Sequence, residues 1–309
     1  MSILMFLTHH SKDKSILDRI VINSKNLFSN LQPTDLGINA QFIDKIIDGL
    51  PSLNYEEKDC HEYRLSIEDD KDNQEALLES ESEFESKFES ESEQSNSLAN
   101  MINEFNLTFK SLDLLGQLTR NYYGSLKVEQ KECLLTEAIH APLRALESIL
   151  GTLRDDPEQV LLMIEDKLRE RMNAKDLSSQ VDINNIARQL LYNVIYAVTY
   201  NIIKKVSTSI GSHNLIPVIE SISKNENTNS LKLIELSTRL DIGNHGSISE
   251  IRKLMKDFKS SGLSTMILKS MVLNYLYMFE LPENERKMLC SSVQINYNPV
   301  AKQIGYENY

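Results

Sequence analysis

The sequence predicts an all-α protein, an irregular multi-helix bundle built around a long central helix over about residues 182–210. Long segments repeat apolar residues at steps of three and four, as one face of an α-helix does. The 309 residues include only 10 glycines and 7 prolines. So few turn-forming residues disfavour an all-β design. The third observation is the central stretch itself, which is apolar along most of its length.

The central stretch runs from Asp182 to Gly211 and predicts a helix buried in the core. Asp182 is expected to cap the first turn, and Gly211 to end the helix in the left-handed conformation. Its uncharged run, from Gln189 to Ile203, is about 15 residues long and too short for a membrane span, which needs about 20. The stripe expected to face the core comprises Ile183, Ile186, Leu190, Val194, Val198, Ile202 and Val206, with Ala187, Leu191, Ile195 and Ile203 beside it.

The chain divides into an N-terminal helical segment (1–55), an acidic linker (56–97) and a helical domain (98–309). In the first part, an amphipathic helix is expected over Ser11–Asn30 and a shorter one over Gln41–Leu50. These helices are too few to bury their own apolar stripes. They must therefore dock on the later helices or on another chain.

The linker over 56–97 is predicted to be disordered, because much of it alternates Glu and Ser and offers little apolar surface. Between Glu68 and Glu93, twelve acidic residues accompany two lysines, a local charge of −10 within a total of −12. The other residues together carry only −2. A uniformly basic nucleic-acid binder is thereby excluded, although a local basic patch is not. Phe84 and Phe88, four residues apart, leave open a helical turn docked on the body.

Helical periodicity resumes at Leu98 and continues almost to the end. Pro142 is expected to kink or break one helix near Ile139, and Ser247 with Glu250 predicts a capping box. The last fifteen residues are expected to form an irregular tail. The expected helices are Leu98–Asn121, Val128–Leu153, Asp156–Met172, the central one, Asn214–Lys224, Ser230–Leu240, Ser247–Lys259, Ser264–Phe279 and Pro282–Ser291.

The cysteines indicate a cytoplasmic protein. Cys60, Cys133 and Cys290 are far apart and odd in number, which suits a reducing compartment and gives no disulfide framework. The apolar start, Met1–Leu7, has no basic leader and is too short for a secretory signal. No membrane segment is visible.

A basic helix face offers a candidate site for an anion or a nucleic acid. Arg252, Lys253, Lys256 and Lys259 recur at helical spacing after the Gly243–Ser247 stretch, and helix N-termini attract anions. An ordinary solvated face explains the same residues without a ligand. The chain contains no phosphate-binding loop of the Gly-x4-Gly-Lys-Ser/Thr type and no Gly-x-Gly-x-x-Gly turn.

The remaining titratable residues predict no catalytic, metal or cofactor site. Cys60 and His61 are adjacent, which does not place two ligands on one ion. Glu137 and His140 have the i, i+3 spacing of di-iron bundles, but such sites need a second pair and two further glutamates. A helix-surface ion pair is favoured for them. A helix-bundle pocket around these two residues remains the enzymatic alternative.

One stretch begins at Gly116 with Gly-Gln-Leu-Thr-Arg-Asn-Tyr-Tyr-Gly, and another contains Asn-Tyr-Leu-Tyr-Met-Phe, ending at Phe279. Together they resemble the helical region downstream of the ATPase core in bacterial STAND-type P-loop NTPases. Many proteins of that class act in defence against phage. The P-loop core is missing, so the resemblance implies no ATP hydrolysis, and Pro142 departs from the small residue expected there. The matched structural positions are Gly116, Asn121, Tyr122, Gly124, Arg144, Tyr275, Phe279 and Arg286.

The sequence therefore favours a non-catalytic interaction or regulatory module. The resemblance implies the sensor or arm region of a STAND NTPase, as a truncated or split subunit of one. The expected partner is another protein, either a P-loop ATPase subunit or a second copy of this chain. Nucleic acid and membrane are disfavoured, and no cofactor is expected. The alternatives are an anion or nucleic-acid binder using the helix over 247–259 and an enzyme with a helix-bundle pocket.

Overall fold

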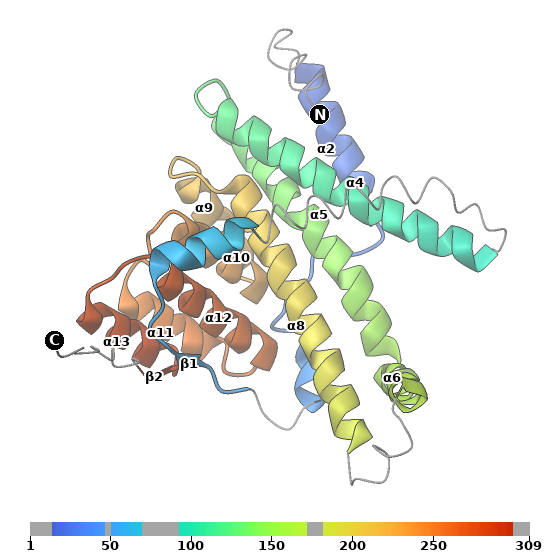
Figure 1. Cartoon of the computed structure of the whole chain (residues 1–309). Helices are drawn as coiled ribbons and strands as arrows, with labels where there is room; N and C mark the ends of the chain where they lie inside the picture. Colours follow the sequence, from blue (N-terminus) through green and yellow to red (C-terminus); the bar gives the residue numbers. More distant parts are fainter. Residues whose placement is uncertain (1–13, 47–50, 70–92, 172–181, 299–309) are drawn as a thin grey trace.

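The computed structural model describes residues 14–46, 51–69, 93–171 and 182–298, and it confirms the all-α fold (Figure 1). The tract with Phe84 and Phe88 lies outside the described residues. None of the described helices is long and apolar enough to cross a bilayer. The helices are α2 (Lys14–Asn26), the 3-10 helix η1 (Gln41–Lys45), α4 (Glu93–Asn121), α5 (Val128–Asp155), α6 (Pro157–Arg171), α8 (Ile183–Ile210), α9 (Ile216–Glu226), α10 (Asn229–Asp241), α11 (Ile248–Asp257), α12 (Gly262–Met278) and α13 (Glu283–Ser292).

The predicted central helix is α8, yellow in Figure 1, which contacts α4, α5, α6, α10 and α12. Asp182 caps it as expected, because its carboxylate accepts a hydrogen bond of 3.1 Å from the amide of Asn185. The prediction for Gly211 is wrong. Its φ is −59°, so α8 ends without a left-handed residue.

The predicted core stripe of α8 is wrong in its first half. Ile186, Leu190 and Val194 are exposed, whereas the flanking residues Leu191 and Ile195 are buried. The apolar residues cover more than half of the circumference of the helix. Their period therefore did not determine which side the neighbouring helices would cover.

Two further predictions concern residues that shape helix packing. α5 is a continuous helix through the buried Pro142, so the predicted break near Ile139 is absent. Gly116 lies where α4 crosses α8, and a Cβ atom there would be 2.1 Å from the backbone oxygen of Ser209. Only glycine allows this approach.

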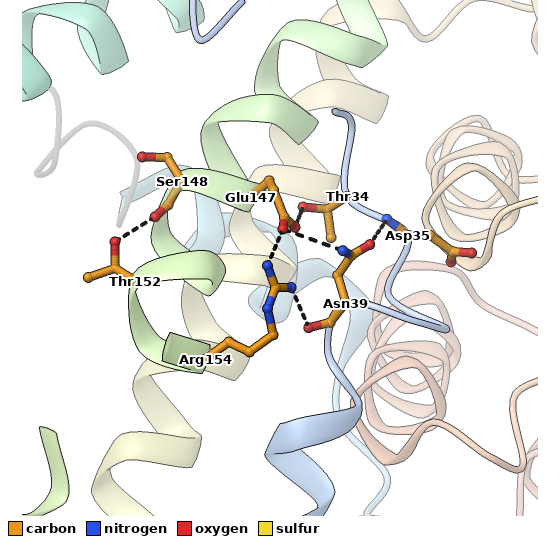
Figure 2. A network of polar contacts seen from close by, with 7 residues as sticks. All are labelled: Thr34, Asp35, Asn39, Glu147, Ser148, Thr152 and Arg154. Carbon is orange, nitrogen blue, oxygen red and sulfur yellow. Dashed lines mark hydrogen bonds and ion pairs between the residues drawn. The ribbon is translucent and has the colours of Figure 1, made fainter. Parts of the chain in front are cut away.

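The N-terminal segment docks on the later helices, as predicted. Glu147 of α5 accepts hydrogen bonds from Thr34 (2.9 Å), Asn39 (3.4 Å) and Arg154 (2.8 Å), and Figure 2 shows this network. The Ser230 hydroxyl of α10 donates to the Thr34 carbonyl at 2.5 Å. These contacts provide hydrogen-bond partners for polar groups of a buried loop, which would otherwise be costly to desolvate.

The prediction of disorder over 56–97 is wrong at both ends. Residues 60–69 form a helix, and α4 already begins at Glu93. Just before the helix over 60–69, β1 (Asn54–Tyr55) pairs in parallel with β2 (Asn296–Tyr297). The predicted irregular tail therefore begins with a strand. The Tyr55 ring lies between those of Tyr277 (centroids 5.6 Å apart) and Tyr297 (5.2 Å), which fastens both chain segments to α12.

Candidate functional site

The first candidate site is an exposed apolar row on α8. Ile186, Leu190 and Val194, each four residues from the next, are 39%, 44% and 51% exposed. Exposed helix faces ordinarily carry charged side chains. Here the exposed positions between residues 189 and 203 are all uncharged. We call the set of Ile186, Gln189, Leu190, Asn193, Val194 and Ala197 the α8 face.

The neighbouring helix α6 adds apolar surface. Leu162 is 57% exposed and Met163 is 63% exposed. Glu165 ties α6 to α8, because its carboxylate accepts a 2.6 Å hydrogen bond from the Asn184 side chain. The two helices pack against each other, and both expose apolar side chains.

The second candidate site is a cleft of about 720 Å³ along the C-terminal half of α8. α10, α12 and the helix over 60–69 form its other sides. The Tyr63 hydroxyl of that helix donates to the Asn274 side chain at 3.0 Å, which holds the helix against α12. The residues that line the cleft are Ile67, Tyr200, Asn201, Lys204, Lys205, Thr208, Ser237, Leu240, Asp241, Met271, Asn274, Tyr275, Met278 and Phe279.

Both lysines of the cleft have carboxylate partners. Lys204 pairs with Asp241 of α10, and Lys205 pairs with Asp113 of α4 at 2.9 Å. Asp113 also accepts a 2.7 Å hydrogen bond from Ser209. An ammonium group has three N–H donors. Each lysine therefore keeps donors beyond the one directed at its carboxylate.

The tyrosines of the cleft act as neutral groups. Burial raises the pKa of Tyr200 above its ordinary value, and the nearby hydroxyl of Tyr196 raises it further. Burial also raises the pKa of Tyr275, with a smaller effect from Glu285. Both phenols are protonated at neutral pH. Neither phenol can serve as a base, and the Tyr275 hydroxyl already donates to the Gly243 carbonyl at 3.4 Å.

The basic face of α11 is on the surface, as the sequence predicts. Arg252, Lys253, Lys256 and Lys259 are exposed, while Ile251 and Phe258 on the other side are fully buried. In the parts of the chain that the structure describes, these four cations form no ion pair.

The N-terminus of α11 is already occupied by a carboxylate. Ser247 and Glu250 form the predicted capping box, with hydrogen bonds of 3.1 and 3.2 Å. Gly246 has a φ of +66°, and a Cβ atom there would be 2.7 Å from Glu250 Oε2. An external anion would have to displace this carboxylate, so the expected anion contact at the helix start is disfavoured.

Glu137 and His140 do not form the expected surface ion pair. Glu137 is buried and binds Arg144 at 2.7 Å, and Arg144 also donates to the backbone oxygens of Ser24 and Leu27 at 3.0 Å. His140 instead contacts Glu226 of α9 at 2.9 Å. Arg144, held by Glu137, therefore anchors the end of α2 to α5, and neither Glu137 nor His140 lines the cleft described above.

The described parts of the chain offer little support for a metal site or a reactive cysteine. They contain no group of three His, Cys, Asp or Glu side chains that could hold a metal ion. Cys60 is half-buried, Cys133 is exposed and Cys290 is buried. Burial raises the pKa of the Cys290 thiol to about 11, so it stays protonated at neutral pH.

The positions matched by the resemblance are dispersed over the structure. Tyr275 and Phe279 line the cleft, Arg144 anchors α2, and Gly116 lies at the crossing of α4 and α8. Arg286 donates to the Tyr55 hydroxyl (3.1 Å) and Glu57 (3.0 Å). Asn121, Tyr122 and Gly124 lie at the end of α4 and in the turn after it.

No local motif in the sequence predicts the cleft. Its polar wall comes from residues of α8 that the periodicity treats as interruptions of a core stripe, among them Asn201 and Thr208. The absence of charge from Gln189 to Ile203 is a usable signal for the α8 face, although it is equally typical of a buried helix. Comparison with protein-family models, curated proteins and solved structures gives no match.

Proposed function

We propose that the protein is a non-catalytic interaction module that binds another polypeptide through the α8 face. The observation that carries this proposal is the exposed row of Ile186, Leu190 and Val194 on a helix whose other side is core. Apolar rows without interspersed charge are typical of surfaces that pack against a partner helix. In this proposal the module works in the cytoplasm, because three well-separated cysteines suit a reducing compartment.

The partner that fits the α8 face best is a second copy of this chain. Two α8 helices can pack antiparallel about a two-fold axis at Val194, which sets Leu190 of each chain against Val198 of the other. The exposed positions carry no charge, so identical faces meet without like-charge repulsion. Antiparallel packing also opposes the two helix dipoles favourably. Two-fold dimers are the commonest symmetric oligomers.

Sedimentation equilibrium tests this proposal. The wild type should reach twice the monomer mass of 35.4 kDa as its concentration rises. The double variant L190D/V194D should remain monomeric, because the interface would bury unpaired carboxylates and the two at position 194 would face each other.

The matched control changes two equally exposed apolar residues elsewhere. Met101 and Leu107 of α4 are 41% and 53% exposed, and M101D/L107D should dimerise as the wild type does. A wild type that stays monomeric up to several hundred micromolar would remove the second copy as partner.

The relation to STAND NTPases also stands as a proposal. It rests on the matched residues and on an all-α architecture without a nucleotide-binding loop. The neighbouring open reading frame tests it. A P-loop ATPase ending immediately upstream would make the chain a split or truncated arm, with that ATPase as the partner of the α8 face.

The basic face of α11 supports a second candidate function, binding to a nucleic acid. Four exposed cations without described ion-pair partners could each contact a phosphate, and such binding weakens steeply with salt. The net charge of −12 opposes it. We expect no measurable binding in a filter assay at about 50 and 200 mM salt. Tight, salt-sensitive binding that K253E/K256E/K259E removes would favour this candidate over the first.

A further inference from the structure

The cleft beside the C-terminal half of α8 does not belong to the α8 face, and a polypeptide partner does not require it. Its volume of about 720 Å³ is in the range of small-molecule sites, roughly 300–1,000 Å³. Four separate parts of the chain converge on it. The chemistry of its walls indicates what it binds.

One wall of the cleft is apolar. Leu240 of α10 and Met271 of α12 are buried, at 4% and 2% exposure, and Met278 and Phe279 continue this wall at the end of α12. Methionine side chains are flexible and polarizable, so they adapt to ligands of varied shape. The wall therefore suits an unbranched apolar tail.

The opposite wall is polar and slightly positive. Lys204 and Lys205 lie between Asn201 and Thr208 along α8. Arg120 of α4, outside the lining, donates to the backbone oxygen of Thr208 at 3.2 Å. These three cations have two carboxylate neighbours, Asp113 and Asp241. One positive charge is left over, which matches a head group with one negative charge.

We propose that the cleft binds an amphipathic monocarboxylate, the class to which medium-chain fatty acids belong. The carboxylate lies against α8 and accepts hydrogen bonds from the N–H groups of Lys204 and Lys205 that are not directed at Asp241 and Asp113. The tail lies along Leu240, Met271 and Met278. A dianionic head group fits less well, because its second charge would meet Asp241 without a further cation.

Tryptophan fluorescence tests this inference. The chain contains no tryptophan, so F279W places a single reporter in the cleft, and M278W is a second reporter in case the first does not fold. The probes are sodium octanoate, decanoate and dodecanoate, each below its micelle-forming concentration. Emission should change saturably. The affinity should rise with each added methylene, by at most about fourfold, which is the value for a fully buried methylene.

Two comparisons isolate the head group. K205M in the reporter background should weaken dodecanoate binding about tenfold, because it removes the surplus positive charge. It should leave the binding of uncharged dodecanol unchanged. The matched control K253M, on the surface of α11, should bind both probes as the parent does.

A reporter outside the cleft controls for non-specific adsorption. F105W on α4, where the Phe105 ring contacts the tilted ring of Phe28 with centroids 5.0 Å apart, should not respond to any probe. The inference is overturned if no probe gives a saturable change in either cleft reporter. It is equally overturned if F105W responds at the same concentrations, or if K205M binds dodecanoate as tightly as the parent.

Discussion

The two faces of α8 contain the same kinds of residue and have opposite environments. Leu191 and Ile195 are 4% and 1% exposed, whereas the neighbouring Leu190 and Val194 are 44% and 51% exposed. Nothing in residue type separates the two pairs. The difference shows that the positions of α4, α5, α6 and α10 decide which face is core. The apolar face that they leave uncovered is the basis of the proposed function.

The largest expected effect is on the buried face. I195D places an unpaired carboxylate among core side chains, and we expect it to abolish soluble expression, because an isolated buried charge costs several kcal/mol. The fraction of soluble protein after expression measures this effect. Normal soluble yield would mean that α8 does not bury this face.

The next effect concerns the helix that covers the end of the buried face. G116A should lower the free energy of unfolding by about 3 kcal/mol, since its Cβ atom would overlap the Ser209 backbone and force α4 away from α8. Urea unfolding measures the change. The control is G151A on α5, where the nearest atom to a Cβ would be 3.7 Å away, on Arg154, so we expect no loss of stability.

An intermediate effect is expected at the boundary between the two faces. Val198 is half-buried and contacts the edge of the core. V198D should cost about 1–2 kcal/mol and leave the protein soluble, because water still reaches the new carboxylate. The periodicity alone would place Val198 in the dry core and predict loss of soluble expression. Thermal melting of the purified variant separates the two expectations.

Sequence periodicity therefore predicted this fold much better than its surfaces. Helix positions follow from local signals such as the Asp182 cap and the Ser247–Glu250 capping box, which act within one or two turns. Which face of α8 is buried depends on helices distant in the chain. The same is true of His140, which binds Glu226 on α9 and not Glu137 on its own helix.

Elements held by tertiary contacts were the hardest to predict. The helix over 60–69 has an acidic sequence that disfavours burial, yet Tyr63 secures it to Asn274. β1 and β2 are two residues long, too short for any strand pattern, and form because Tyr55 and Tyr297 stack. The cleft has no sequence signal, because its walls come from four distant segments.

The smallest effect on stability is expected on the exposed face. V194D should change the free energy of unfolding of the monomer by no more than about 0.5 kcal/mol, as surface substitutions usually do. The measurement is urea unfolding at low micromolar concentration, where the monomer dominates. A loss of several kcal/mol would show that Val194 is packed within the single chain.

Disulfide trapping can detect whether the α8 faces of two chains pack antiparallel about Val194. V194C in a C133S background places the new thiol on the proposed two-fold axis and removes the exposed native one. Two thiols there can reach disulfide geometry, which needs Cα atoms about 4.4–6.8 Å apart. After mild oxidation, a non-reducing gel should show V194C/C133S as a covalent dimer and L107C/C133S as a monomer. A monomeric V194C/C133S, or equal cross-linking of both variants, would contradict antiparallel packing of two α8 faces about Val194.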